Sequence, residues 1–400
     1  MGGSENSTSE SEIGTDLADV AGSSADGAAS VYSPRRSMPT DFSISLGRSG
    51  GIDHQLRDHP TTGRDRRQAM LGFDATYTDI VDYIVRVTHR IWEEKDIGYI
   101  YDVYRHNAHV IDDSGLKYGR DRVVEETLQT VSALPDVRLF ADEVIWAGDE
   151  EAGFQTSHRV FIVGNNTGPS RWGPATGRRV VTWCLADCKS VANEIYEEWV
   201  LYNTSGLLLQ LGHDPFVVAR GSGAAQSASI AVHGEAEHLR GQRKPQPYQG
   251  AMSGTFDIDS FLRATLHDEW NMRNLSIIDK AYSPVVRFHG PGGRELYGRG
   301  ELKAFVLSLM ASFPDLLHSV DDLYFMGNKR DGYLASLRWS VVGTHRGWGL
   351  YGRPTGRPAR MWGISQYRII DDQIVDEWTL FNEFELIQSL HDFELAGSFT

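Results

Sequence analysis

The chain has 400 residues and carries 54 acidic against 39 basic side chains, a formal net charge of −15 at pH 7. An acidic surface repels phosphate backbones, so this balance argues against a nucleic-acid partner. No apolar run reaches the roughly 20 residues that span a bilayer, so no membrane partner is expected either. Cys184 and Cys188 are too far apart on an expected strand to form a disulfide. With no secretory signal at the first residues, this favours a cytoplasmic protein.

The first 72 residues are rich in Ser, Gly, Asp and Glu and poor in large apolar side chains. Residues 1–30 hold six carboxylates and no Lys or Arg. Such a segment cannot bury enough apolar surface to offset the entropy lost on ordering. We therefore expect residues 1–72 to form a disordered tail.

Helices come next in the chain. Apolar residues recur at helical spacing over 79–96. A short helix, an extended stretch at 108–111 and a further helix at 123–134 follow, and Pro135 closes the last because proline cannot continue a helix. Four strands separated by Gly, Asn and Asp are then expected, at 138–146, 154–163, 179–187 and 195–202. About three helices followed by an antiparallel meander indicate an α+β domain.

The sequence contains this pattern of helices and strands twice. Residues 118–203 and 297–382 align without a gap at an offset of 179, with 24 identities over 86 positions. A period this long exceeds the roughly 20–50 residues of solenoid repeats, so it indicates a duplicated domain. We expect a first domain over 73–213, a flexible linker rich in Gly, Ala and Ser over 214–255, and a second domain over 256–395.

Short motifs in both copies carry a family resemblance. The second copy contains Thr344-His345-Arg346-Gly347, then Thr355-Gly356-Arg357, then Asp376-Glu377-Trp378. The first keeps Thr176-Gly177-Arg178 and Glu198-Trp199. These segments resemble the SnoaL-like polyketide cyclases of the NTF2-like superfamily. The resemblance implies that each copy is a cone, in which a curved antiparallel sheet wraps helices around a small-molecule pocket.

The catalytic pair implied by this resemblance is missing from both copies. The position of the cyclase aspartate falls at Val200 and Thr379, and neither side chain can abstract a proton. The position of the cyclase histidine falls at Ala186 and Ser365. Cyclisation of a polyketide by that pair is therefore not expected.

Glu198 and Glu377 are the carboxylates that remain on the strand face expected to line each cone. An apolar cone would raise a glutamate pKa towards neutrality, which suits general acid–base catalysis. The alternative is a structural ion pair with Arg159 or Arg338 on the neighbouring strand. Both arginines are therefore also candidates for ligand binding.

Histidines and aromatic residues complete the candidate site. His158 and His345 each occur in one copy only, so each is a candidate catalyst or a polar residue satisfied by its neighbours. Trp183 and Trp362 could stack on a ligand, or could belong to the core or an interface. The remaining candidate ligand-binding residues lie on the final strands: Tyr202, Thr379 and Phe381.

No metal or cofactor is expected, because the chain has no metal-ligand spacing and no glycine-rich strand-to-helix turn for a dinucleotide. Three readings stay open. The chain could be a cofactor-free isomerase, cyclase or dehydratase acting on a hydrophobic, carbonyl-bearing molecule. It could instead be a non-catalytic binding or assembly module, or could combine one active with one structural copy. The fuller motif around His345 favours the second copy as the active one. The outer sheet faces could pack together as an intramolecular pseudo-dimer, with further homo-oligomers possible.

Overall fold

The structure is a computed structural model that describes residues 68–221 and 256–391. Most of the predicted tail and residues 222–255 of the predicted linker lie outside these ranges. Met70 is already buried in the first hydrophobic core, so ordered packing begins before the predicted domain start at residue 73. The first residues of the predicted linker form helix α6 (Pro215–Gly221).

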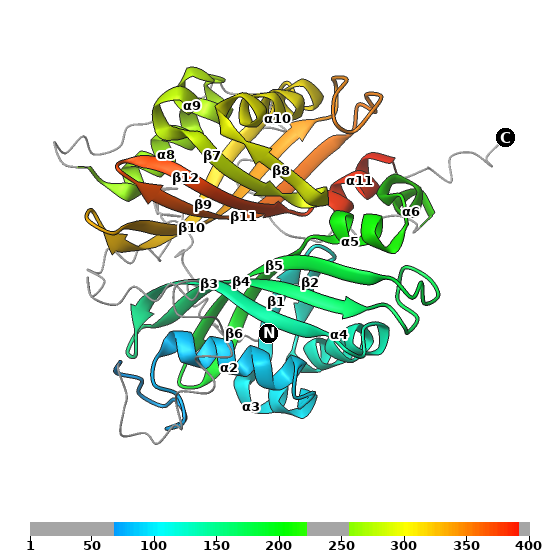
Figure 1. The fold of residues 1–400 in the computed structure, drawn as a ribbon, viewed down its shortest axis with the longest axis vertical. Helices are drawn as coiled ribbons and strands as arrows, with labels where there is room; N and C mark the ends of the chain where they lie inside the picture. Colours follow the sequence, from blue (N-terminus) through cyan, green and yellow to red (C-terminus); the bar gives the residue numbers. More distant parts are fainter. Residues whose placement is uncertain (1–67, 222–255, 392–400) are drawn as a thin grey trace, which may run out of the picture. The chain divides into compact units, whose positions relative to one another are not determined.

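The first copy forms a six-stranded sheet in the order β2-β1-β6-β5-β4-β3. Helices α2, α3 and α4 lie along one face of this sheet (Figure 1). The elements are α2 (Ile80–Trp92), η2 (Ile97–Tyr99), α3 (Ile100–Val103), β1 (Tyr104–Asp112), β2 (Gly115–Tyr118), α4 (Arg120–Ala133), β3 (Arg138–Asp149), β4 (Gly153–Asn165), β5 (Arg179–Val191), β6 (Glu194–Tyr202) and α5 (Thr204–Leu211).

The second copy repeats this arrangement, with strand order β8-β7-β12-β11-β10-β9. A π-helical turn, labelled η3, replaces the last turn of the first helix. The elements are α8 (Ile258–Leu266), η3 (His267–Asn271), α9 (Ser276–Ala281), β7 (Tyr282–Gly290), η4 (Pro291–Gly293), β8 (Arg294–Tyr297), α10 (Gly298–Ser312), β9 (Leu317–Asn328), β10 (Gly332–Thr344), β11 (Pro358–Ile370), β12 (Gln373–Phe381) and α11 (Glu383–His391).

Both domains confirm the predicted α+β class, with one difference in the sheet. The last four strands of each copy form the predicted antiparallel meander. The first strand, β1, pairs in parallel with the last, β6, and β7 pairs in the same way with β12. Each sheet is therefore mixed. The prediction missed this because the parallel partners are separated by a helix and three strands, and no local pattern reports such a pairing.

Local signals start and stop the helices, and the stops at proline were predicted. The Asp79 side chain caps α2 by accepting a hydrogen bond from the backbone of Asp82. Asp257 caps α8 in the same way. Helices α4 and α10 each end one cap residue before a proline, Pro135 and Pro314, as the proline rule predicts.

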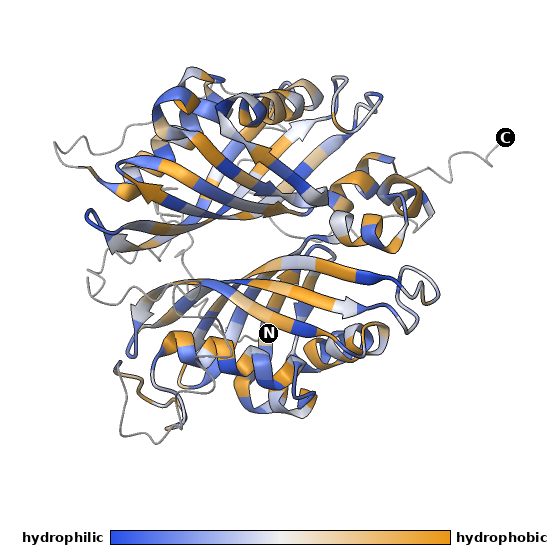
Figure 2. Ribbon diagram, viewed as in Figure 1, coloured by the Kyte–Doolittle hydropathy of each residue, from blue (hydrophilic) through white to orange (hydrophobic). Residues whose placement is uncertain are grey.

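Apolar and polar residues alternate along the strands, so each sheet has two distinct faces (Figure 2). One face packs against its own helices. The other carries the tryptophans of the last two strands of the meander, including Trp183 and Trp362. A cavity lies on the helix-covered side of each sheet.

Candidate functional site

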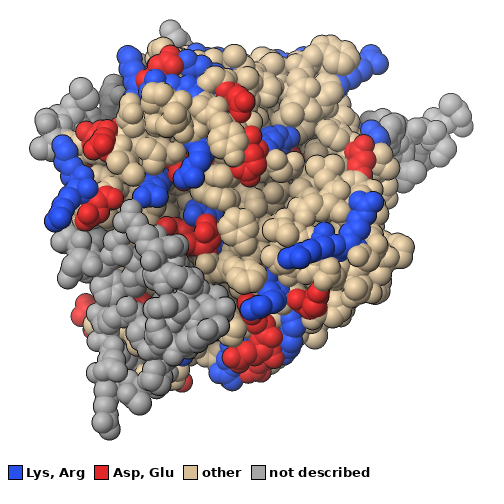
Figure 3. Space-filling view, viewed as in Figure 1, with Lys and Arg blue, Asp and Glu red and all other residues tan. Residues whose placement is uncertain are grey.

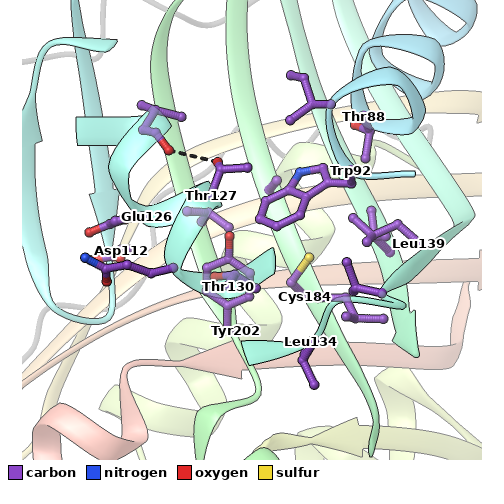
Figure 4. Close-up of a pocket in the computed structure, with 18 of the residues that line it drawn as sticks. Thr88, Trp92, Asp112, Glu126, Thr127, Thr130, Leu134, Leu139, Cys184 and Tyr202 are labelled. Carbon is purple, nitrogen blue, oxygen red and sulfur yellow. Dashed lines mark hydrogen bonds between the residues drawn. The ribbon is translucent and has the colours of Figure 1, made fainter. Parts of the chain in front are cut away.

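The first domain contains a cavity of about 260 Å³ between its sheet and helices α2, α4 and α5. Figure 4 shows that side chains from the helices and from the strands converge on it. Trp92, Leu134 and Leu139 make part of its apolar wall. Exposed Gln129 on α4 and half-exposed Arg171 also line it, which places the mouth between α4 and the loop after β4.

Glu198 is the carboxylate that reaches into this cavity. It lies on β6 beside Cys188 of β5 and Val110 of β1, on the strand face that points at the helices. It is only half-buried, and because it lines the cavity its exposed surface faces that space. Its carboxyl accepts a hydrogen bond of 2.8 Å from the Tyr104 hydroxyl.

Burial raises the pKa of Glu198 above its usual range. The hydrogen bond from Tyr104 and the charge of Lys117 act in the opposite direction, while the carboxyls of Asp112 and Glu126 raise the pKa further. A raised pKa lies closer to neutral pH than that of an ordinary glutamate, which favours general acid–base catalysis.

Tyr104→Phe is expected to raise the pKa of Glu198, because it removes a hydrogen bond that stabilises the carboxylate. The carboxyl ¹³C resonance of labelled glutamate, assigned with Glu198→Gln, would report the change. Tyr282→Phe, at the matching position of the second domain, is the control and should leave Glu198 unchanged. An unaltered or lowered pKa in Tyr104→Phe would contradict the assigned role of the hydroxyl.

His158 also lines the first cavity. It lies on β4 directly opposite Ala186, the position at which the family resemblance places a histidine. Burial lowers the pKa of His158 to about 3, so its ring is neutral at physiological pH. Its Nε2 atom has no hydrogen-bond partner among the residues that the structure describes. A neutral imidazole of this kind can donate or accept a hydrogen bond, but does not supply a positive charge.

The second domain holds a smaller cavity, of about 50 Å³, around Glu377. The Thr379 hydroxyl donates a hydrogen bond of 2.8 Å to Glu377. Burial raises the pKa of Glu377 to about 7. Glu269 lines the same cavity and was missed by the sequence analysis. It lies in the π-helical turn, and its only sequence signal is a carboxylate where the first copy has the apolar Ile91.

The two domains also differ at one cross-strand pair beside the cavities. Trp339 lines the second cavity and pairs across the sheet with Gly363. A Cβ atom on Gly363 would lie 2.2 Å from the Trp339 ring, so the tryptophan needs the glycine beside it. The matching pair in the first domain is Val160 and Cys184, which leaves the space open.

The remaining strand candidates divide between the cavities and the opposite sheet face. Tyr202 lines the first cavity, and Thr379 and Phe381 line the second. Trp183 and Trp362 instead belong to an apolar cluster on the face turned away from the helices.

The arginine and loop-histidine candidates do not line either cavity. Arg159 bonds to Asp142 and to Gln366, each at 2.6 Å, rather than to Glu198. Arg338 lies 3.8 Å from Asp322 rather than beside Glu377. His345 lies in the loop after β10, where its Nδ1 atom is 3.2 Å from the Thr355 hydroxyl. Of the two predicted glutamates, Glu198 lines the larger cavity and Glu377 the smaller one.

Within residues 68–221 and 256–391, no group of three or more His, Cys, Asp or Glu side chains is arranged to hold a metal ion. In the same ranges, no helix is long and apolar enough to cross a membrane. On the face shown in Figure 3, acidic and basic side chains are interspersed.

Comparison with known proteins matches residues 261–390 to the family described as SnoaL-like polyketide cyclase. Similar solved structures include AclR, a putative hydroxylase from Streptomyces galilaeus, at 22% identity and a TM-score of 0.30, covering 34% of this chain and 96% of that one. IdmH, a putative polyketide cyclase from Streptomyces antibioticus, is 24% identical at a TM-score of 0.29, covering 34% and 99%. Similarity at this level says nothing about the reaction. No curated protein gives a significant match.

Proposed function

We propose, from the match of residues 261–390 to the SnoaL-like family and the repeated strand order of the two sheets, that the chain carries tandem SnoaL-like domains of the NTF2-like superfamily and that its first domain is a cofactor-free acid–base enzyme. Its substrate is a hydrophobic, carbonyl-bearing metabolite, and the reaction is of the isomerase, cyclase or dehydratase type. The free, buried cysteines Cys184 and Cys188 suit the reducing cytoplasm in which we place it.

The observation that carries this proposal is that Glu198, which is only partly buried, lines a cavity that also has an apolar wall. In the proposed reaction, Glu198 takes a proton from the carbon beside the carbonyl and returns it to another atom of the same molecule. Negative charge develops on the carbonyl oxygen meanwhile, and a hydrogen-bond donor must stabilise it. The neutral ring of His158 is the side chain that we assign to this task.

The second domain is assigned a supporting role. Its cavity has a volume of about 50 Å³. One water molecule needs about 10–15 Å³ of such space, so this cavity holds a few waters rather than a metabolite. Glu377 is chemically suited to proton transfer, but Trp339 and Tyr367 occupy the space that a substrate would need.

We also propose that the two domains form an intramolecular pseudo-dimer. Among the described residues, Trp183 meets Trp378 with ring centres 5.1 Å apart, and Trp199 meets Trp362 with ring centres 5.2 Å apart. The offset of 179 relates Trp183 to Trp362 and Trp199 to Trp378, so each contact is the repeat equivalent of the other. Such reciprocity is expected of a two-fold interface, so a fused family dimer accounts for both pairs.

A second candidate is a module that binds a ligand without converting it. The observation in its favour is that Val200 and Ala186 stand where the family resemblance places the cyclase pair. The two candidates agree on the cavity and differ on the chemistry of Glu198.

The test is exchange of α-protons for deuterium in apolar ketones such as 1-tetralone, followed by NMR in D₂O. We expect the wild-type protein to catalyse the exchange. The double variant Val160→Trp/Cys184→Gly should lose both binding and exchange, because it installs the pair that fills the second cavity. If the double variant still catalysed the exchange, the activity would lie outside the first cavity. Binding without exchange in the wild type would favour the second candidate.

A further inference from the structure

Acidic side chains gather at one end of the first cavity. Asp112 of β1 and Glu126 of α4 both line it, and Figure 4 shows the two side by side at the same end. Asp113 follows Asp112 in the chain and is also buried. Glu198 is close enough for Asp112 and Glu126 to raise its pKa.

Within residues 68–221 and 256–391, the cations in this region do not balance these four carboxyls. Lys117 forms ion pairs with both Asp112 and Glu126. Arg171 lies 3.8 Å from Asp113 and stacks on the Trp172 ring at 4.3 Å, with half of its side chain exposed. Glu198 bonds to the neutral Tyr104. This end of the cavity therefore carries more acid than base.

The other end of the cavity is apolar. Trp92, Leu134 and Leu139 lie there, away from Asp112 and Glu126 (Figure 4). Thr127 lies between the two ends, but its hydroxyl is already bonded to the Val123 carbonyl. A ligand that fills the cavity thus meets hydrocarbon at one end and carboxyls at the other.

We propose that the ligand of the first cavity is a hydrophobic amine, whose protonated nitrogen faces Asp112 and Glu126 while its apolar body packs against Trp92 and Leu139. This inference names the substrate class of the site proposed above and rests on that proposal. The carbonyl on which Glu198 acts would belong to the same molecule.

Electrostatics give the reason for this preference. A cation placed among excess carboxyls in a partly dry cavity gains more attraction than it would in water. It also replaces the hydration that the carboxyls lose when the cavity fills. An anion of the same shape meets repulsion from the same groups.

Three probes that share one ring system test the charge preference: 1-naphthylmethylamine, 1-naphthalenemethanol and 1-naphthoate. Naphthalene fluorescence reports binding to the full chain directly. We expect the amine to bind about tenfold or more tighter than the alcohol, as one charge-assisted contact allows. The carboxylate should bind more weakly than the alcohol. Equal affinities for the amine and the alcohol, or tighter binding of the carboxylate, would overturn the proposal.

Glu126→Gln identifies the source of the preference, with Glu125→Gln as its matched control. Both residues lie on α4, but Glu126 lines the cavity, whereas Glu125 is exposed and pairs with Arg122. Glu126→Gln should lower the ratio of amine to alcohol affinity by about three- to tenfold and leave the alcohol affinity unchanged. Glu125→Gln should alter neither. Equal effects of the two variants would mean that the net charge of −15, and not the cavity, attracts the amine.

These measurements read binding alone, so they are separable from the proposed reaction. An amine preference without proton exchange would sustain this inference and contradict the catalytic role of Glu198. Proton exchange without an amine preference would do the opposite.

Discussion

Glu198→Gln should slow α-proton exchange by about 10²–10⁴-fold, the usual contribution of a general acid or base. Glutamine has nearly the same shape and can still bond to Tyr104, but it cannot take up the substrate proton. Ligand affinity should therefore change little, and the loss should appear in the rate at saturating ligand. Single-site exchange kinetics by NMR, with binding measured separately, resolve the two quantities.

Glu377→Gln is the matched control, because it makes the same change at the aligned position of the second domain. Its exchange rate should equal that of the wild type. A comparable loss in both variants would mean that both domains react. If Glu198→Gln lost affinity and rate in parallel, Glu198 would be a binding residue rather than a catalyst.

Trp339→Val should open the second cavity and change the binding stoichiometry from one ligand per chain to two. Valine is the residue that the first domain has at this position, opposite Cys184. Removing a large buried aromatic ring should also lower the free energy of unfolding by about 2–4 kcal/mol. Ser365 loses the hydrogen bond from the Trp339 indole but keeps its partner Thr379. Calorimetric titration and denaturant unfolding measure the two effects.

Trp362→Val separates the opening of the cavity from general destabilisation. Trp362 is buried in the same domain, but on the sheet face away from the cavity. This variant should lose comparable stability and still bind one ligand. If Trp339→Val also stays at one ligand per chain, then the indole ring is not what closes the second cavity.

The sequence repeat, the prolines at helix ends and the alternation along the strands predicted the fold well. The last two signals are local. Proline at the ends of α4 and α10 and alternation along the strands each act within a few residues. The parallel β1–β6 pairing is long-range, and it is this pairing that brings Tyr104 of the first strand to the same end of the sheet as Glu198. The partner of the candidate acid was therefore not predictable from strand patterns.

Strand alternation also explains which candidates gathered at a cavity. His158 and Arg159 are adjacent on β4, so their side chains point to opposite faces of the sheet. His158 lines the first cavity, whereas Arg159 packs over Trp378, with its guanidinium carbon 4.4 Å from the ring centre. The two side chains therefore cannot belong to one site. Cavity size was beyond prediction, since it depends on the cross-strand pairing of Trp339 with Gly363.

A structure of the full chain with a bound apolar ketone would show directly which cavity holds the reacting molecule. We expect one ketone in the first cavity, with its α-carbon or carbonyl oxygen about 2.6–3.5 Å from Glu198 or His158. The second cavity should remain filled by Trp339. A ketone bound around Glu377, or one in the first cavity that makes no contact with Glu198, would contradict it.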